Sequence, residues 1–310
     1  MSEEKQKNEK RYETEWSFSF EEIGNSINKA LGTLGEEAKE ETFTAAKEGA
    51  QSARIIIGGS VGRNTIIALE RGSDNLFEAD VRHLGEMRFE VSGDSEKVIT
   101  LRPHFQQDFA TPLRRAIGQI GKKQDLYLRV RISPDIPVHL ELHGGVGPTD
   151  FDLSALDLIG LKTDGGVGPT TLSLPTTDHP YNVNLDGGVG GITINAPATT
   201  HVRMDLDGGV GPAVLNIPAD ASLDIKMKGG VGGTSLNVAP GVALHVEADG
   251  GLGGVNVPAS LKRIKSNDDF ISKGGVWESA GFALASKRVN VDYDGGVGGF
   301  RIKQQDVEIV

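Results

Sequence analysis

The sequence predicts an all-β protein, a β-solenoid of stacked short strands with an N-terminal helical appendage. The first observation is a repeated tetrapeptide, Gly-Gly-Val-Gly, whose copies follow at steps of 21 or 22 residues and finally of 45. A fixed period of this size is the signature of a repeat architecture. The sixth copy has Leu in place of Val. The first glycines of the copies are Gly144, Gly165, Gly187, Gly208, Gly229, Gly250 and Gly295.

The second observation is the alternation of apolar and polar residues on both sides of each tetrapeptide. Leu223, Ile225 and Met227 precede Gly229 with polar residues between them. Strict alternation indicates a strand with one buried face. A second alternation follows each turn, and in several copies it ends at a proline such as Pro218, which cannot donate to a ladder. Each repeat of about 21 residues is therefore predicted to be strand, glycine turn, strand and proline corner.

The glycine turn has a physical explanation in this fold. Glycine reaches positive φ without strain and lets successive backbones pass closely. One repeat cannot bury its own apolar face, so the repeats must stack and share a core. We expect the valine of each tetrapeptide to point inward and plug the corner.

Residues 1–50 are predicted to form a separate arm. A charged tail is followed by an aromatic, strand-like segment and then by an amphipathic helix with apolar residues on one face. The arm either caps the open edge of the solenoid or docks on a partner, which includes self-association with a second copy. The candidate contact residues of the arm are Trp16, Phe18, Phe20, Ile23, Ile27 and Leu31.

Residues 51–310 are predicted to form the solenoid domain, with residues 55–103 as divergent coils of the same stack and the copy at Gly295 closing it. A helical insertion is expected at 104–123 and a side loop at 262–280. Residues 102–131 carry seven Lys or Arg against two Asp, a local charge of +5. The basic helix at 112–120 either packs on the solenoid or makes a weak contact with an anionic membrane. The candidate contact residues here are Arg114, Arg115, Lys122 and Lys123.

Composition narrows the range of functions that the chain can have. The 310-residue chain has a net charge of −11, which argues against nucleic-acid binding, and it has no cysteine for disulfides or thiolate chemistry. The start of the chain has no signal-peptide pattern, and no apolar run is long enough to cross a bilayer. These features predict a soluble cytoplasmic protein, peripheral at the membrane if the basic helix binds lipid.

A recurring aspartate is the main candidate for chemistry. Asp precedes the double glycine five times, whereas His143 and Lys228 take this position in two copies. Asp either caps the turn through its side-chain acceptor or contributes to a metal ladder, which Lys228 would interrupt. No phosphate-binding loop, nucleophile elbow or metal-spaced histidine pair occurs. We therefore expect no enzyme activity, cofactor, metal or small-molecule substrate; an enzyme acting on a polymer such as a polysaccharide is the alternative.

Residues 124–175, which hold the first two tetrapeptides, resemble the toast-rack family, as do IIIGGSVGRNTIIAL upstream and SKGGVWESAGFALASKRVNVDYDGGVGGF downstream. The resemblance covers roughly residues 53–305. This bacterial family includes adhesins and the C-terminal domains of cell-envelope stress-response proteins. It implies a β-rich interaction or signalling module, and it brings no catalytic residues. The chain lacks the membrane-spanning segment of many members, which counts against a direct membrane sensor.

Overall fold

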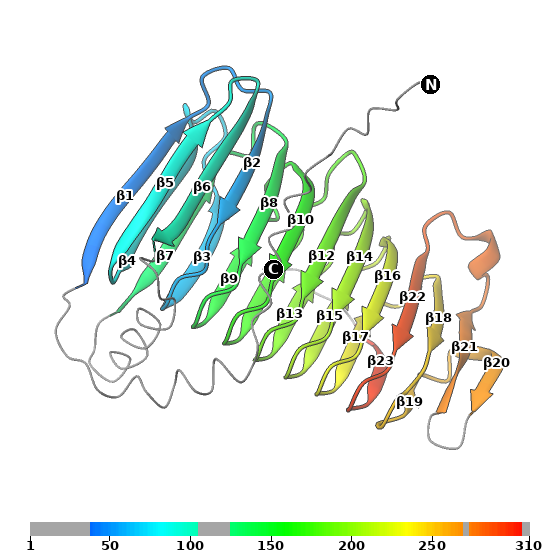
Figure 1. Cartoon of the computed structure of the whole chain (residues 1–310). Helices are drawn as coiled ribbons and strands as arrows, with labels where there is room; N and C mark the ends of the chain where they lie inside the picture. The colour runs from blue at the N-terminus through cyan, green and yellow to red at the C-terminus, as the bar shows by residue number, and fades with distance from the viewer. Residues whose placement is uncertain (1–37, 105–124, 269–272, 306–310) are drawn as a thin grey trace, which may run out of the picture.

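In the described part of the chain the regular secondary structure is almost all β, in two long sheets that pack face to face (Figure 1). The structure is a computed structural model that describes residues 38–104, 125–268 and 273–305. The prediction of an all-β fold of stacked strands is confirmed. Within the described residues the helical content is a single 3-10 turn, η2 (Phe282–Leu284).

One sheet has eleven strands and the other has twelve. In spatial order the eleven-stranded sheet comprises β1 (Lys39–Ala46), β4 (Asn75–His83), β7 (Tyr127–Ile132), β3 (Arg63–Ala68), β9 (Thr149–Asp152), β11 (Thr170–Ser173), β13 (Ile192–Asn195), β15 (Ala213–Ile217), β17 (Thr234–Val238), β23 (Phe300–Gln304) and β19 (Val255–Asn256). The twelve-stranded sheet comprises β20 (Leu261–Asp268), β21 (Lys273–Ser279), β18 (Leu244–Ala248), β22 (Val289–Asp294), β16 (Ser222–Lys228), β14 (His201–Asp207), β12 (Tyr181–Asp186), β10 (Leu158–Asp164), β8 (Val138–His143), β2 (Ser52–Ile57), β6 (Glu96–His104) and β5 (Glu86–Ser92).

The repeating unit is a coil, which is one strand of the twelve-stranded sheet, a glycine corner and one strand of the eleven-stranded sheet. We name each coil by the first glycine of its corner, so that β12 and β13 belong to coil 187. Successive coils pair in parallel and in register: Leu206 lies beside Met227, for example, and Leu215 beside Leu236. In-register stacking places equivalent residues of every coil in columns along the stack.

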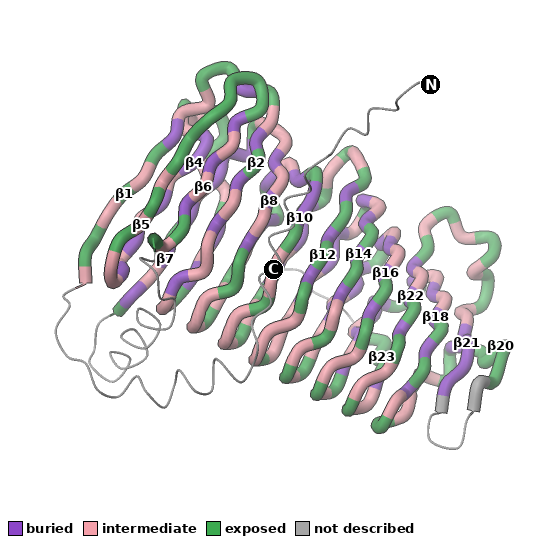
Figure 2. Tube along the Cα trace, viewed as in Figure 1, coloured by how far each residue is buried: buried purple, intermediate pink, exposed green. Residues whose placement is uncertain are grey.

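The core lies between the two sheets and runs the length of the stack. Inward-facing residues of both sheets alternate with exposed ones along each strand (Figure 2). In coil 208 the inward residues Val202, Met204, Leu206 and Leu215 are all at most 4% exposed. This pattern follows from the period-2 alternation in the sequence.

The N-terminal end of the stack departs from the prediction of several divergent coils. Residues 52–68 form a single coil, β2 and β3, whose corner Gly59 stacks against Gly144. The remaining strands are paired antiparallel as β1 with β4, β4 with β7, and β5 with β6. Two antiparallel extensions therefore finish this end, and β1 supplies the edge strand of one sheet.

The C-terminal end contains two further corrections. The coil at Gly295 does not close the stack, because β22 pairs with both β16 and β18 and so lies between coils 229 and 250. Residues 262–280 are not a side loop: β20 and β21 form an antiparallel hairpin that extends the twelve-stranded sheet past β18. Trp277 of this hairpin is only 7% exposed, which explains why a segment with so many polar residues is held in place.

Several predictions fall on parts of the chain outside the described residues. These are the arm residues Trp16, Phe18, Phe20, Ile23, Ile27 and Leu31, and the basic residues Arg114, Arg115, Lys122 and Lys123 of the expected insertion. The described part of the predicted appendage, residues 38–50, contains strand β1 and a turn, so no helical appendage is supported there. In the described part of the chain, no helix has the length and apolar character needed to span a membrane.

The aromatic pair in coil 295 gives a first prediction. Phe300 is 1% exposed and stacks on Tyr293 with ring centroids 4.3 Å apart. Phe300→Ala is expected to lower the free energy of unfolding by about 3–5 kcal/mol, because it removes a large buried ring and leaves a cavity. Arg301→Ala is the control, because Arg301 is exposed on the outer face and should change stability by less than about 0.5 kcal/mol. Equal losses in urea titrations of the two variants would contradict the placement of Phe300 in the core.

Candidate interaction surface at the glycine corner

The corner is shaped by the close approach of neighbouring backbones. A Cβ on Gly187 would lie 2.2 Å from the backbone nitrogen of Gly209 in the next coil. A Cβ on Gly188 would lie 2.1 Å from the carbonyl oxygen of Gly166 in the preceding coil. Gly190, the fourth residue of the tetrapeptide, has a φ of +138°. Each glycine is therefore required for a separate reason: contact with the next coil, contact with the preceding coil, and backbone conformation.

The valine of each tetrapeptide joins the coils through its backbone, and its side chain is half-buried in the first coils and exposed from Val210 onward. The Val167 N–H donates to Gly145 O at 2.8 Å, and the Gly168 N–H donates to Val189 O at 2.8 Å. The expectation of a buried plug is wrong: Val231 and Val297 are 53% and 51% exposed, and none of these valines is buried. The valine ridge, with a Leu at its end, comprises Val61, Val146, Val167, Val189, Val210, Val231, Val297 and Leu252.

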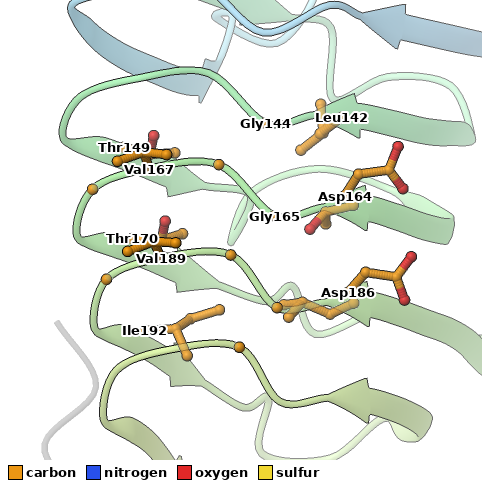
Figure 3. Close-up of a pocket in the computed structure, with 18 of the residues that line it drawn as sticks. Leu142, Gly144, Thr149, Asp164, Gly165, Val167, Thr170, Asp186, Val189 and Ile192 are labelled. Carbon is orange, nitrogen blue, oxygen red and sulfur yellow. The ribbon is translucent and has the colours of Figure 1, made fainter. Parts of the chain in front are cut away.

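A row of mostly acidic residues runs beside the valine ridge, at the ends of the strands of the twelve-stranded sheet. Parallel pairing aligns this acidic row, which comprises His143, Asp164, Asp186, Asp207, Lys228, Asp294 and Asp249. Figure 3 shows Asp164 and Asp186 one above the other beside the glycine turns. The stacking that builds the core therefore also concentrates negative charge along one side of the ridge.

Partners offset only part of this charge. His143 Nδ1 lies 2.6 Å from Asp164 Oδ2, and Lys228 Nζ lies 3.0 Å from Asp207 Oδ1. Burial, and then the neighbouring carboxylates of Asp164 and Asp207, raise the pKa of Asp186 above its usual range. Turn capping by Asp is seen at Asp249, whose Oδ1 accepts from the Gly251 N–H at 3.0 Å. The row is thus a charged surface feature, and within it the carboxylate of Asp186 is repelled by the neighbouring carboxylates.

A shallow polar hollow of about 650 Å³ lies on the outer face of the same sheet, over β12, β14, β16, β22 and β18. Its charged residues include Arg203, Asp205, Lys226 and Asp292. Across the strands Asn290 Nδ2 donates to Asp224 Oδ1 at 2.8 Å. Among the described residues no group of three or more His, Asp or Glu side chains could hold a metal ion. The outer face is therefore suited to polar contacts with a partner.

The structure places all seven sequence-predicted glycines at corners, in the spatial order 144, 165, 187, 208, 229, 295 and 250. A family profile described as the N-terminal domain of toast_rack (DUF2154) matches residues 34–195, just over half of the 310-residue chain. The chain belongs to the toast-rack family. The matched part includes β1, the antiparallel extensions and coils 59 to 187, so the family assignment covers the N-terminal end of this toast-rack fold and its first corners.

Two solved structures are similar to this toast-rack chain. A putative cell adhesion protein from Clostridium sporogenes ATCC 15579 is 16% identical, with a TM-score of 0.40 over 87% of this chain and 100% of its own. A putative adhesin from Bacteroides fragilis NCTC 9343 is 14% identical, with a TM-score of 0.38 over the same shares. No curated protein sequence shows a significant match.

The glycine geometry gives a prediction with a control inside one coil. Gly187→Ala is expected to destabilise the protein by about 2–3 kcal/mol, because its Cβ would enter the backbone of the next coil. Gly191→Ala should cost less than about 1 kcal/mol or stabilise slightly, since the nearest atom to its Cβ is Pro212 Cγ at 3.4 Å. Thermal unfolding followed by circular dichroism measures both. The stacking model is wrong at this corner if both variants unfold alike.

The acidic row gives a pH-dependent prediction. The pKa of Asp186 is higher in the folded than in the unfolded chain, so its ionised form costs the native state free energy above the folded pKa, and this cost disappears below the unfolded pKa. Asp186→Asn is expected to raise the Tm at pH 7 by about 1–2 °C and to leave it unchanged near about pH 3. Asp207→Asn is the control, because its charge is paired with Lys228 and its loss should bring no such gain. Equal gains in both variants would show that pairing within the row does not matter.

Proposed function

We propose that this toast-rack chain is a non-catalytic interaction module whose contact surface is the corner, comprising the valine ridge and the acidic row. The observation that carries the proposal is the ridge itself. Eight apolar side chains line up along one edge of the stack without being buried, and from Val210 onward the exposed fractions exceed 40%. A continuous exposed apolar feature rimmed by polar residues is typical of a protein-binding site.

The chemistry of the corner indicates the kind of partner. The ridge suits aliphatic side chains, and the acidic row, in which Asp186 is incompletely compensated, suits Lys or Arg at its side. The partner in this proposal is therefore a protein segment that carries apolar and basic residues together. Direct ridge-to-ridge pairing of two copies is less suitable, because it would bring two acidic rows into proximity. A role in cell-envelope stress signalling rests on the family resemblance alone.

The membrane-sensor alternative depends on the basic helix expected at 112–120, which lies outside the described residues. Flotation with anionic liposomes at low and high salt tests it. Retention that is lost in Arg114→Glu with Arg115→Glu would favour this alternative over the corner proposal. Unchanged retention in that variant would rule out the membrane-sensor alternative.

The corner proposal is tested by affinity capture with matched variants. Val189→Ser with Val210→Ser and Val231→Ser removes the ridge, and Asp186→Lys with Asp207→Lys reverses the row. Because none of these side chains is buried, we expect folding to persist while captured partners are reduced at least tenfold. Thr171→Lys with Ser235→Lys, on the outer face of the eleven-stranded sheet, is the control and should retain them. Partners that survive both corner variants but are lost in the control would overturn the proposal.

A further inference from the structure

The two ends of the stack are stepped in opposite senses. Beyond coil 59 the eleven-stranded sheet continues through β7, β4 and β1, whereas the twelve-stranded sheet continues through β6 and β5. Beyond coil 250 the twelve-stranded sheet continues through β21 and β20, whereas the eleven-stranded sheet stops at β19 (Figure 1). One sheet therefore projects at the N-terminal end and the other sheet projects at the C-terminal end.

The twelve-stranded sheet ends in two edge strands of similar length that run in opposite directions. β5 has seven residues and β20 has eight. β5 is antiparallel to β6, which runs parallel to the strands of the coils. Two antiparallel pairings separate β20 from β18, so β20 runs in the same direction as the coils. Two copies placed end to end in the same orientation would thus bring β20 of one copy beside β5 of the other as an antiparallel pair.

The edge strands at the two ends carry opposite net charge. β1 and β5 together hold four carboxylates and two cations, whereas β20 holds three cations and one carboxylate. Glu86 at one end and Lys262 and Lys265 at the other are exposed, and none of the three forms a salt bridge within the described residues. Contact between unlike ends is therefore electrostatically favourable, whereas contact between like ends brings together edges of the same net charge.

The core is incompletely covered at the N-terminal end. Phe43 of β1 and Phe89 of β5 face each other across the two sheets with ring centroids 5.2 Å apart, and both are only partly buried. Val91 is paired with the buried Ile99 on the inner side of the sheet, yet it is 42% exposed. A neighbouring copy at this end would remove apolar surface from water, which favours association.

The β20 edge has features that make its pairing selective. A bulge between Arg263 and Lys265 interrupts the strand and leaves Ile264 51% exposed. Bulges and exposed lysines are the usual means by which an edge strand avoids unspecific pairing. They disfavour a second basic edge and leave an acidic edge as the suitable partner. Within the described residues, the acidic edge at an end of this sheet is β5.

We propose that the ends of the stack bind a second copy of this chain head to tail, with β20 of one copy beside β5 of the next. The contact joins two different surfaces, so every added copy leaves one of each free and the assembly is an open filament. The corner lies along the side of the stack and is not part of this contact. The proposal therefore stands or fails separately from the corner proposal, and a filament would present many corners to one partner.

The test is sedimentation velocity of the full chain over a range of protein concentrations. The average mass is expected to rise with concentration beyond that of a dimer and to fall at high salt, since the ends attract by charge. A mass of one chain at every concentration would overturn the proposal. A mass that stops at two chains would also overturn it, because it indicates a closed contact between like ends.

Charge reversal identifies the surfaces involved. Glu86→Lys with Glu90→Lys at one end, or Lys262→Glu with Lys265→Glu at the other, should each raise the dissociation constant of self-association at least about tenfold, because like charges then meet. A chain with all four changes has opposite charges again and should associate within about threefold of the unmodified protein. Failure of this rescue in a chain that unfolds cooperatively would contradict pairing of these two edges.

A control separates the edges from net charge. Arg203→Glu with Lys226→Glu changes the charge of the chain by the same amount as the β20 variant, at exposed positions in the middle of the twelve-stranded sheet. This variant should associate as the unmodified protein does. If it loses association as fully as the β20 variant, total charge controls the assembly and the edges do not.

Discussion

The structure depends on the contact between glycine backbones at the corner. In coils 144 to 229 and in coil 295 a Cβ on the first glycine would clash with the next coil and a Cβ on the second would clash with the preceding coil, and the fourth residue adopts positive φ. This contact fixes the register of both sheets at once, because a coil that shifted by one residue would bring a side chain into the turn. The in-register core columns, the acidic row and the valine ridge are all consequences of that alignment.

Much of the repeat region could be predicted from the sequence. The 21-residue step and the alternation before Gly229 predict the strands, the turns and the parallel stacking, since each of these depends on the local sequence pattern. The orientation of the valines could not be extracted in the same way. Val189 stands between glycines in a turn that interrupts the alternation, so its side chain follows the curve of the turn and not the pleat of a strand. The sequence did carry one sign of this orientation: Val189 has no apolar neighbour two residues away that would share its face.

The ends of the stack were less predictable because they are set by non-local pairing. The alternation in residues 75–83 and 96–104 fits a solenoid coil or an antiparallel strand equally well, and the partner strand decides between them. The order of the last coils is decided by packing: Tyr293 and Phe300 are too large for a terminal position facing water. In the same way, Trp277 anchors a hairpin that its polar neighbours did not indicate. The acidic row was visible in sequence, whereas the incomplete compensation of Asp186 required the spatial order of its neighbours.

The position of coil 295 has a consequence for synthesis of the chain. Domains form progressively from the N-terminus as the ribosome extends them, and coils 59 to 229 can add to the stack in chain order. Coil 250 then emerges before the segment that separates it from coil 229. The coil that it pairs with in parallel is complete only once residue 304 has been made, so coil 250 cannot take its place in the stack until coil 295 has emerged. A chain that stopped before coil 295 would lose that coil and would also leave coil 250 without its native parallel partner.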